Sequence, residues 1–477
     1  MLLIFFLILF VNAHVRMNLS AQAHPNDRLT QRDSVEGNLA NRKILFTAEF
    51  KVGSEEDTIR VWTMTGANLF WFPTSNCHSG DHKRDTSSEV SKCDSAGVYI
   101  PSELTTFHNT SKVFQWWYLI FESGAWGYFG TDRVQYGDFS GDMTFGIATN
   151  ANYVGQLGLG FRNYQKTSLQ STLNESSFLE QLVRKGDISS NAYSFQLGIN
   201  NASEGTLLLG AVDHRKYEGT LQKVKMVDMY TDGADSVLIL LDGILGSDFS
   251  SELNIAVDIR MEYTTLSLPV GAFNELIAHL NAVRAYNKYL VPCDLLDLTD
   301  LVSFYFSGVE IQVPVRDLIF QNAYFGCEIS IDERDKPPYL GQDILKSAYV
   351  VVNLDNKEVA LAQASNSPDE KLEDIVSQIP LALAAPLYSY TEVAKKYYYS
   401  STWWFSSLYN VSSRTSYSTN TASRSVDLGS TTYELFYPDA TSMYDYYAST
   451  NHPKHGNSGP STRYLPSLLL FSILLAF

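Results

Sequence analysis

The feature that most constrains the fold is a long series of strand-like runs between residues 44 and about 365. Gly, Asn or Asp turns separate these apolar or alternating runs from one another. Ile44–Gly53 alternates, and Val61–Pro73 places two apolar runs on either side of the turn Thr65-Gly66. Long helical patterns are few, and the 29 Tyr and 26 Phe favour strands over helices. The pattern predicts an all-β domain.

In Val61–Pro73 a strand, a tight turn and a second strand carry Thr65, Gly66, Trp71 and Pro73. These residues stand in register with the first active-site loop of pepsin-like aspartic proteases of the fungal yapsin and candidapepsin branch, which the segment resembles. Further motifs of that family follow in the same order, and the resemblance covers roughly residues 44–364. Its other matching segments are Ser123–Asp132, Leu157–Phe161, Ala192–Leu197, Glu204–Gly219, Tyr289–Cys293 and Pro338–Ala364.

The resemblance implies a bilobal fold, in which two β-barrel-like lobes, about 44–220 and 221–364, lie around a cleft. It also implies two aspartates that share one proton, one acting as a base toward water and the other as an acid toward the scissile carbonyl. Each aspartate belongs to an Asp-Thr/Ser-Gly loop. The glycine allows close backbone approach, and the hydroxyl braces one loop against the other.

Neither aspartate position is acidic in this chain. The first position holds Met64. For the second, counting back from Pro269 without a gap gives Arg260, whereas aligning the following Thr-Thr pair gives Met261. Asp258 lies close by as a fallback acid, but Ile-Arg follows it rather than Ser/Thr-Gly. A lone carboxylate cannot fill both roles, so the loops predict that no intact catalytic pair remains.

The flap that covers the family's cleft is altered as well. Tyr118 stands at the position of the flap tyrosine, but bulky residues in Leu119–Glu122 replace the glycines that let the hairpin tip move. The residues that we expect at the cleft, by resemblance, are Thr65, Gly66, Ala67, Tyr118, Thr264 and Thr265.

The charge of the chain limits its partners. The formal charge is −17, from 52 acidic and 35 basic residues, which argues against a nucleic-acid partner and favours basic peptides or a solvated acidic surface. The nine His show no spacing typical of a metal site, and no Gly-rich phosphate loop is present. We therefore expect no metal or cofactor, and a monomer.

The amino-terminal region predicts entry into the secretory pathway. Met1–Val11 is continuously apolar but too short to span a membrane, and the small residue Ala13 follows, so residues 1–13 (to about 20) are predicted to be a signal peptide. Residues 14–43 are polar and end in Arg42-Lys43, which predicts a short pro-segment or flexible arm.

The carboxy-terminal region predicts a stalk and a lipid anchor. Residues 365–456 are rich in Ser, Thr and Tyr and include a helix-like piece, Asp369–Ile379. Residues 457–477 combine small residues, a polar spacer and an apolar tail, which is the layout of a glycosylphosphatidylinositol (GPI) signal. The predicted attachment residue is Asn457, with Gly456 or Ser458 as near alternatives. A C-terminal tail anchor is the alternative.

Four cysteines in a secreted chain allow three pairings. The resemblance implies Cys77–Cys93 and Cys293–Cys327, one disulfide in each lobe. Asn-x-Ser/Thr sequons predict N-glycosylation at Asn109, Asn174, Asn201 and Asn410, whereas Asn18 lies close to the signal cleavage site.

Three functions follow from these observations. The leading hypothesis is a cell-surface, GPI-anchored pseudo-protease that binds peptides or cell-wall proteins in its cleft without cutting them. The second is an active aspartic endopeptidase that uses Asp258 with another acid. The third is a structural or adhesive wall protein that acts through its stalk. Pepstatin-sensitive cleavage at acid pH would distinguish the second from the others.

Overall fold

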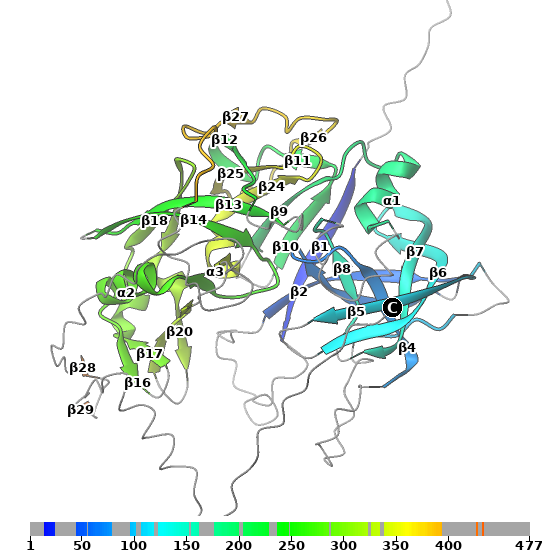
Figure 1. Ribbon diagram of the computed structural model, residues 1–477, viewed down its shortest axis with the longest axis horizontal. Helices are drawn as coiled ribbons and strands as arrows, with labels where there is room; N and C mark the ends of the chain where they lie inside the picture. Colours follow the sequence, from blue (N-terminus) through cyan, green and yellow to red (C-terminus); the bar gives the residue numbers. More distant parts are fainter. Residues whose placement is uncertain are drawn as a thin grey trace, which may run out of the picture. The chain divides into compact units, whose positions relative to one another are not determined.

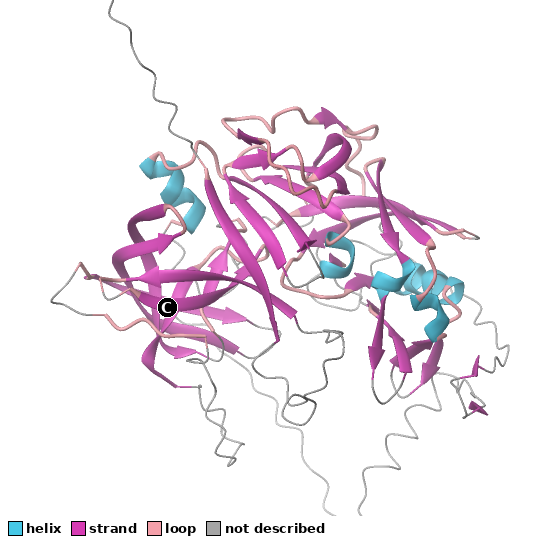
Figure 2. Cartoon of the chain, turned by 180° about the vertical axis from the view of Figure 1, so that it is seen from behind, coloured by secondary structure: helices cyan, strands magenta, loops and turns pink. Residues whose placement is uncertain are grey.

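A computed structural model describes residues 14–23, 44–54, 56–78, 96–101, 106–118, 123–151, 154–161, 176–199, 204–228, 236–247, 249–285, 288–322, 326–333, 338–393, 426–427 and 432–433. The chain divides into two compact units, Met1–Ser418 and Thr419–Phe477. In the second unit the described strands are β28 (Val426–Asp427) and β29 (Thr432–Tyr433), which pair with each other. In the first unit strands predominate (Figure 2), which confirms the all-β prediction.

One 14-stranded sheet contains most strands of the first unit, in the order β27-β12-β25-β24-β9-β10-β1-β2-β3-β8-β4-β7-β6-β5 (Figure 1). Its amino-terminal strands are β1 (Val15–Ala23), β2 (Ile44–Val52), β3 (Asp57–Met64), β4 (Phe70–His78), β5 (His108–Tyr118), β6 (Ser123–Tyr136), β7 (Phe139–Ala151) and β8 (Gln156–Gly158). The others are β9 (Ala192–Ile199), β10 (Glu204–Leu209), β12 (Tyr217–Lys225), β24 (Ala348–Asn353), β25 (Glu358–Ala364) and β27 (Leu383–Ala384).

The remaining sheets belong mostly to the carboxy-terminal half. A five-stranded sheet contains β13 (Leu238–Leu245), β14 (Ser250–Ile259), β18 (Leu301–Phe306), β19 (Val309–Pro314) and β23 (Tyr339–Leu340). A four-stranded sheet contains β16 (Val283–Ala285), β17 (Lys288–Val291), β20 (Ile319–Asn322) and β21 (Gly326–Ile329). Two short pairs join β11 (Ala211–Asp213) to β26 (Leu372–Asp374) and β15 (Leu266–Leu268) to β22 (Ile331–Glu333).

The described helices are short: α1 (Phe178–Lys185), α2 (Val270–His279), α3 (Gln342–Leu345) and the 3₁₀ helices η1 (Cys293–Leu296) and η2 (Val315–Leu318). Ser177 and Glu180 form a capping box at the start of α1, and Gly186 ends that helix in the left-handed conformation. Among the described residues, no helix has both the length and the apolar character that a membrane crossing requires.

A continuous apolar core lies under the strands of both halves. In the amino-terminal half it is strongly aromatic, because Phe50, Phe70, Phe72, Phe145 and Phe178 meet edge to face or at a tilt, with ring centroids 4.8–6.1 Å apart. These rings hold β4, the strand that follows the first active-site-like loop, against β2, β7 and α1.

Within residues 14–43, where we predicted a short pro-segment or flexible arm, the structure describes a strand. Val15–Ala23 is β1, which pairs antiparallel with β10 at one edge and with β2 at the other. Val15, Met17 and Leu19 are buried in the core. Their burial stabilises the fold by about 2 kcal/mol each. Residues 24–43, including Arg42-Lys43, lie outside the described residues.

The structure also corrects the stalk boundary at residue 365. Residues 365–393 belong to the folded unit: β26 pairs with β11, and β27 pairs with β12. Ile375 and Ile379 are buried against Val212 and Tyr349. The segment Asp369–Ile379, expected to be helix-like, contains β26 instead of a helix, because long-range pairing outweighs its local helical propensity.

The candidate catalytic loops

The two loops that correspond to the predicted active site follow equivalent strands. β3 ends at Met64 and runs parallel to β8, while β14 ends at Ile259 and runs parallel to β23. Behind each loop lies a glycine, Gly158 or Gly341. A Cβ at either glycine would lie within 2.6 Å of the loop backbone, so a larger residue would push the loop out of place.

Thr65 braces the first loop against the second. Its Oγ1 donates to the carbonyl oxygen of Ile259 at 2.6 Å and accepts from the amide of Met261 at 3.2 Å. These two contacts lie on either side of Arg260. Of the two registers that the sequence allows, this geometry places Arg260 opposite Met64, where the resemblance requires the second aspartate.

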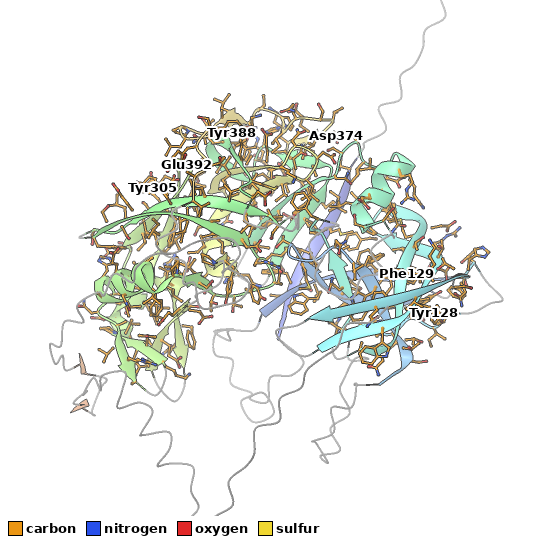
Figure 3. The ribbon with its side chains drawn as sticks, viewed as in Figure 1. Tyr128, Phe129, Tyr305, Asp374, Tyr388 and Glu392 are labelled. Carbon is orange, nitrogen blue, oxygen red and sulfur yellow. A yellow bond between two sulfur atoms is a disulfide. The ribbon has the colours of Figure 1, made fainter. Side chains whose placement is uncertain are left out.

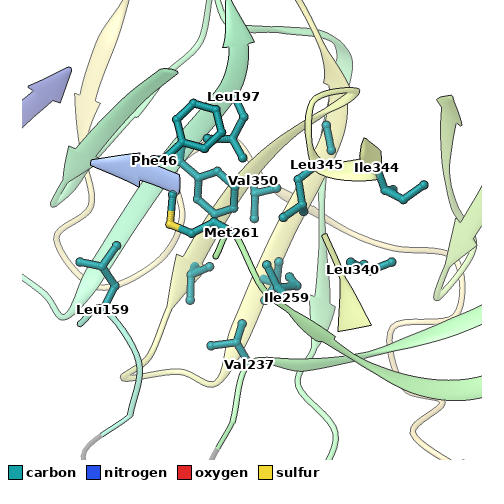
Figure 4. Packing of buried hydrophobic residues seen from close by; sticks show 14 of the residues in the cluster. Phe46, Leu159, Leu197, Val237, Ile259, Met261, Leu340, Ile344, Leu345 and Val350 are labelled. Atoms are coloured by element: carbon teal, nitrogen blue, oxygen red, sulfur yellow. The ribbon is translucent and has the colours of Figure 1, made fainter. Parts of the chain in front are cut away.

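Met261 has a different role from the one considered in the sequence. Its side chain is fully buried and packs in the core beneath the loops, close to Phe46 and Val350 (Figure 4). Gln342 donates from Nε2 to its carbonyl oxygen at 2.8 Å. Met64 is also buried, at 2% exposure. Both methionines are therefore packing residues without acid–base chemistry.

Arg260 lies between two carboxylates. Its Nη2 donates to Oδ2 of Asp258 at 2.6 Å, and its Nη1 donates to Oε1 of Glu262 at 3.0 Å. Ser236 adds a hydrogen bond to the same oxygen of Asp258 at 2.8 Å. The exposed fractions of the Asp258, Arg260 and Glu262 side chains are 5%, 7% and 1%. We call these three residues the buried charge cluster.

Glu262 completes the contact between the loops. Its carboxylate accepts from the amide of Thr65 at 3.1 Å and from the amide of Gly66, also at 3.1 Å. Sequence reasoning missed Glu262, although a signal existed: with Arg260 at the aspartate position, Glu262 stands where the family pattern has glycine. A glycine has no side chain, so the hydrogen bonds to Thr65 and Gly66 depend on the Glu262 carboxylate.

The side chains of the buried charge cluster leave no room for a side chain at Gly66. A Cβ at this residue would lie 1.2 Å from Nη1 of Arg260 and 2.5 Å from Oε1 of Glu262. The guanidinium therefore lies directly over the Gly66 backbone. The glycine of the first loop is retained in this chain, but the space beside it holds an ion pair.

The electrostatics of the cluster do not produce a proton-sharing pair of acids. Burial raises the pKa of Asp258, while Arg260 and the Ser236 hydroxyl oppose that rise. A protease of this class needs two carboxyl groups that contact one water molecule. Here one oxygen of each carboxylate binds the guanidinium, and Arg260 joins the two groups. Within the described ranges no cluster of His, Cys, Asp or Glu is arranged to hold a metal.

The other predicted cleft residues lie partly beside these loops. Ala67 is buried, and Thr265 donates from Oγ1 to Asp332 Oδ2 at 3.0 Å. The carbonyl oxygen of Thr264 accepts from the amide of Asp343 at 3.0 Å. Tyr118 is the last residue of β5 and pairs with Ser123 across the hairpin. Its side chain, and residues 119–122 at the hairpin tip, lie outside what the structure describes.

The predicted covalent features are described in part. Cys293 and Cys327 form a disulfide, as the resemblance implied. Asn109 is exposed on β5, where a glycan can be carried. The remaining predicted sites lie outside the described residues or have no described side chain: Cys77, Cys93, Asn174, Asn201, Asn410 and Asn457.

Comparisons with known proteins match the same span of the chain. The family model described as "Eukaryotic aspartyl protease" matches residues 45–364. The chain is 31% identical over 383 residues to "Aspartic proteinase yapsin-3" of Saccharomyces cerevisiae, an alignment that covers 74% of this chain and 73% of that protein. It is 28% identical over 348 residues to "Secreted aspartic protease 5" of Candida albicans, covering 70% and 79%. It is 30% identical over 325 residues to "Aspartic proteinase 3" of Saccharomyces cerevisiae, covering 63% and 56%.

Proposed function

Because this chain belongs to the eukaryotic aspartyl protease family, with a pepsin-like fold, we propose that it is a non-catalytic member that binds peptides or cell-wall proteins between its lobes. One observation supports this most strongly. Arg260 occupies the position of the second catalytic acid and binds the carboxylates of Asp258 and Glu262. Met64 occupies the position of the first. The site therefore has no pair of acids that can activate water.

The fallback acid Asp258 does not offer a route to catalysis. It is the second-last residue of β14, buried and bonded to Ser236 and Arg260. A general base must reach the proton that it removes, at about 2.6–3.2 Å from the substrate water. Asp258 would have to leave both partners to do so, and Met64 would still supply no second acid.

We further propose that the protein acts outside the cell, held by a GPI anchor at Asn457. A relative in Candida albicans is named a secreted aspartic protease, which supports an extracellular location. The apolar beginning of the chain and the small-residue, spacer and tail layout of residues 457–477 support the same route. Release of the protein from intact cells by a phosphatidylinositol-specific phospholipase tests the anchor.

A peptide-capture experiment tests the proposed function. The purified secreted protein, without residues 457–477, is incubated with a peptide pool rich in dibasic sequences, and bound peptides are identified by mass spectrometry. We expect intact peptides to be enriched at both pH 4 and pH 7. Recovery of cleaved products, or no enrichment over buffer, would overturn the proposal.

A matched pair of variants on β5 shows where the peptides bind. The resemblance places Tyr118 over the cleft, whereas Val113 on the same strand is 64% exposed. We expect Tyr118→Ala to weaken capture at least tenfold and Val113→Ala to leave it unchanged. Equal effects of both variants would place binding elsewhere.

A further inference from the structure

β1 forms antiparallel pairs with a neighbouring strand on each of its two edges. Val15–Ser20 pair with Leu209–Glu204 of β10, and Ser20–Ala23 pair with Thr47–Ile44 of β2. β1 thus lies between two strands of the sheet (Figure 1). Val15, Met17 and Leu19 face the core, with exposed fractions of 7%, 0% and 2%.

The start of β1 is fixed by charges from distant parts of the chain. Nδ1 of His14 lies 2.8 Å from Oδ1 of Asp374, which Figure 3 labels near that end of the strand. Arg16 pairs with Glu370, and its Nη2 lies 4.0 Å from the buried Oδ2 of Asp213. Carboxylates therefore surround the first residues of the strand.

From this arrangement we infer that the signal peptide is cleaved between Ala13 and His14, and that β1 is a permanent strand of the mature protein. Cleavage near residue 20 would remove Val15, Met17 and Leu19 from the core and leave β10 without its partner. Release of residues 14–43 would also open the edge of β2. Cleavage after Ala13 keeps every pairing of β1 with β10 and β2.

Amino-terminal sequencing of the secreted full chain from a fungal host tests this inference. The expected first residues are His14-Val15-Arg16. A product that begins only near residue 20, or only at Ile44, would overturn it. If the host cuts after Lys43, we expect a fragment that begins at His14 to remain with the protein through native chromatography and to separate in denaturant. Loss of that fragment on the native column would also contradict the inference.

A pair of substitutions gives an independent measurement on the mature protein. Met17→Ala removes a fully buried side chain of β1, and Glu49→Ala removes an exposed side chain of similar length on β2. If β1 is retained, Met17→Ala lowers the Tm of the secreted protein by several degrees and Glu49→Ala does not. If β1 is absent from the mature protein, Met17→Ala leaves the Tm unchanged, which would overturn the inference.

Discussion

Arg260 stands where the family pattern has its second aspartate, and its side chain binds two carboxylates there. Its guanidinium binds two buried carboxylates, and each of these has a further partner, Ser236 for Asp258 and the first-loop amides for Glu262. Buried charges of this kind depend strongly on one another. Removing the cation alone leaves two carboxylates in a dry site.

Arg260→Met is therefore expected to destabilise the protein by about 3–5 kcal/mol at pH 7. The triple variant Asp258→Asn, Arg260→Met, Glu262→Gln removes all the charges together and is expected to lose less. Because protonation relieves unpaired carboxylates, the loss in Arg260→Met is expected to shrink at pH 4. Urea unfolding at both pH values measures this, and a triple variant less stable than Arg260→Met would contradict it.

Gly66, in the first loop, lies against the guanidinium of Arg260, so a substitution at Gly66 tests the same ion pair. The Cβ of Gly66→Ala would overlap the guanidinium of Arg260, so we expect the pair to separate and stability to fall by about 2–4 kcal/mol, the cost of a disrupted buried ion pair. In an Arg260→Ala background the overlap is absent, and the same change is expected to cost much less. The double-mutant cycle measures the coupling. Additive losses would show that the two residues do not meet.

Asp242 lies outside the two loops, and we expect its carboxyl group to make the stability of the protein depend on pH. Burial raises its pKa to about 6, although the amide of Gly308 donates to its Oδ2 at 2.5 Å. The folded-state pKa lies above the unfolded value of about 3.9, so its contribution to stability is full below pH 4 and is lost as pH rises through 6. We expect Asp242→Asn to flatten the stability profile between pH 4 and pH 7. An unchanged slope in this window would contradict the assignment.

At the scale of elements, the disulfide supports the small sheet formed by β16, β17, β20 and β21. Cys293 begins η1 and Cys327 lies in β21, which connects segments 34 residues apart. We expect the double variant Cys293→Ser, Cys327→Ser to be less stable by about 2–4 kcal/mol in chemical unfolding. A wild-type midpoint would show that the sheet does not depend on this link.

Sequence reasoning predicted the strand that ends at Met64 but could not settle its counterpart. The flanking Thr65, Gly66 and Pro73 fix the first register, whereas the second loop allowed Arg260 or Met261. The contacts that decide between them join Thr65 to residues about 195 positions away. Glu262 was missed for the same reason, because its partners lie on the other loop.

The strands β1 and β26 were also missed by sequence reasoning, because their partners lie far away in the chain. Val15, Met17 and Leu19 alternate, but residues 14–43 read as one polar segment when taken together. Leu372–Asp374 is charged and looks helical, yet it pairs with Ala211–Asp213 far away in the chain. Local patterns fix where strands exist, and long-range pairing decides which short segments become strands.

At the scale of the whole molecule, the fold of a protease is kept while its central loops carry an ion pair in place of two acids. The parallel strand pairs, the glycines behind the loops and the Thr65 brace all remain. The differences from the family pattern include Met64, Arg260 and Glu262 in the loops and the segment Leu119–Glu122 in the flap. Under the proposed function, peptides bind at this surface and are not cut.

The most direct test is turnover by the pure secreted protein. Unfolded protein substrate is incubated for a day at pH values from 3 to 7, with and without pepstatin, and new peptide termini are counted by mass spectrometry. The matched control is the Asp258→Asn variant, which removes the fallback acid, so that a contaminating protease would cleave equally in both preparations. We expect no pepstatin-sensitive termini from either protein. Pepstatin-sensitive cleavage at acid pH by the wild-type chain, absent from the control, would contradict the account.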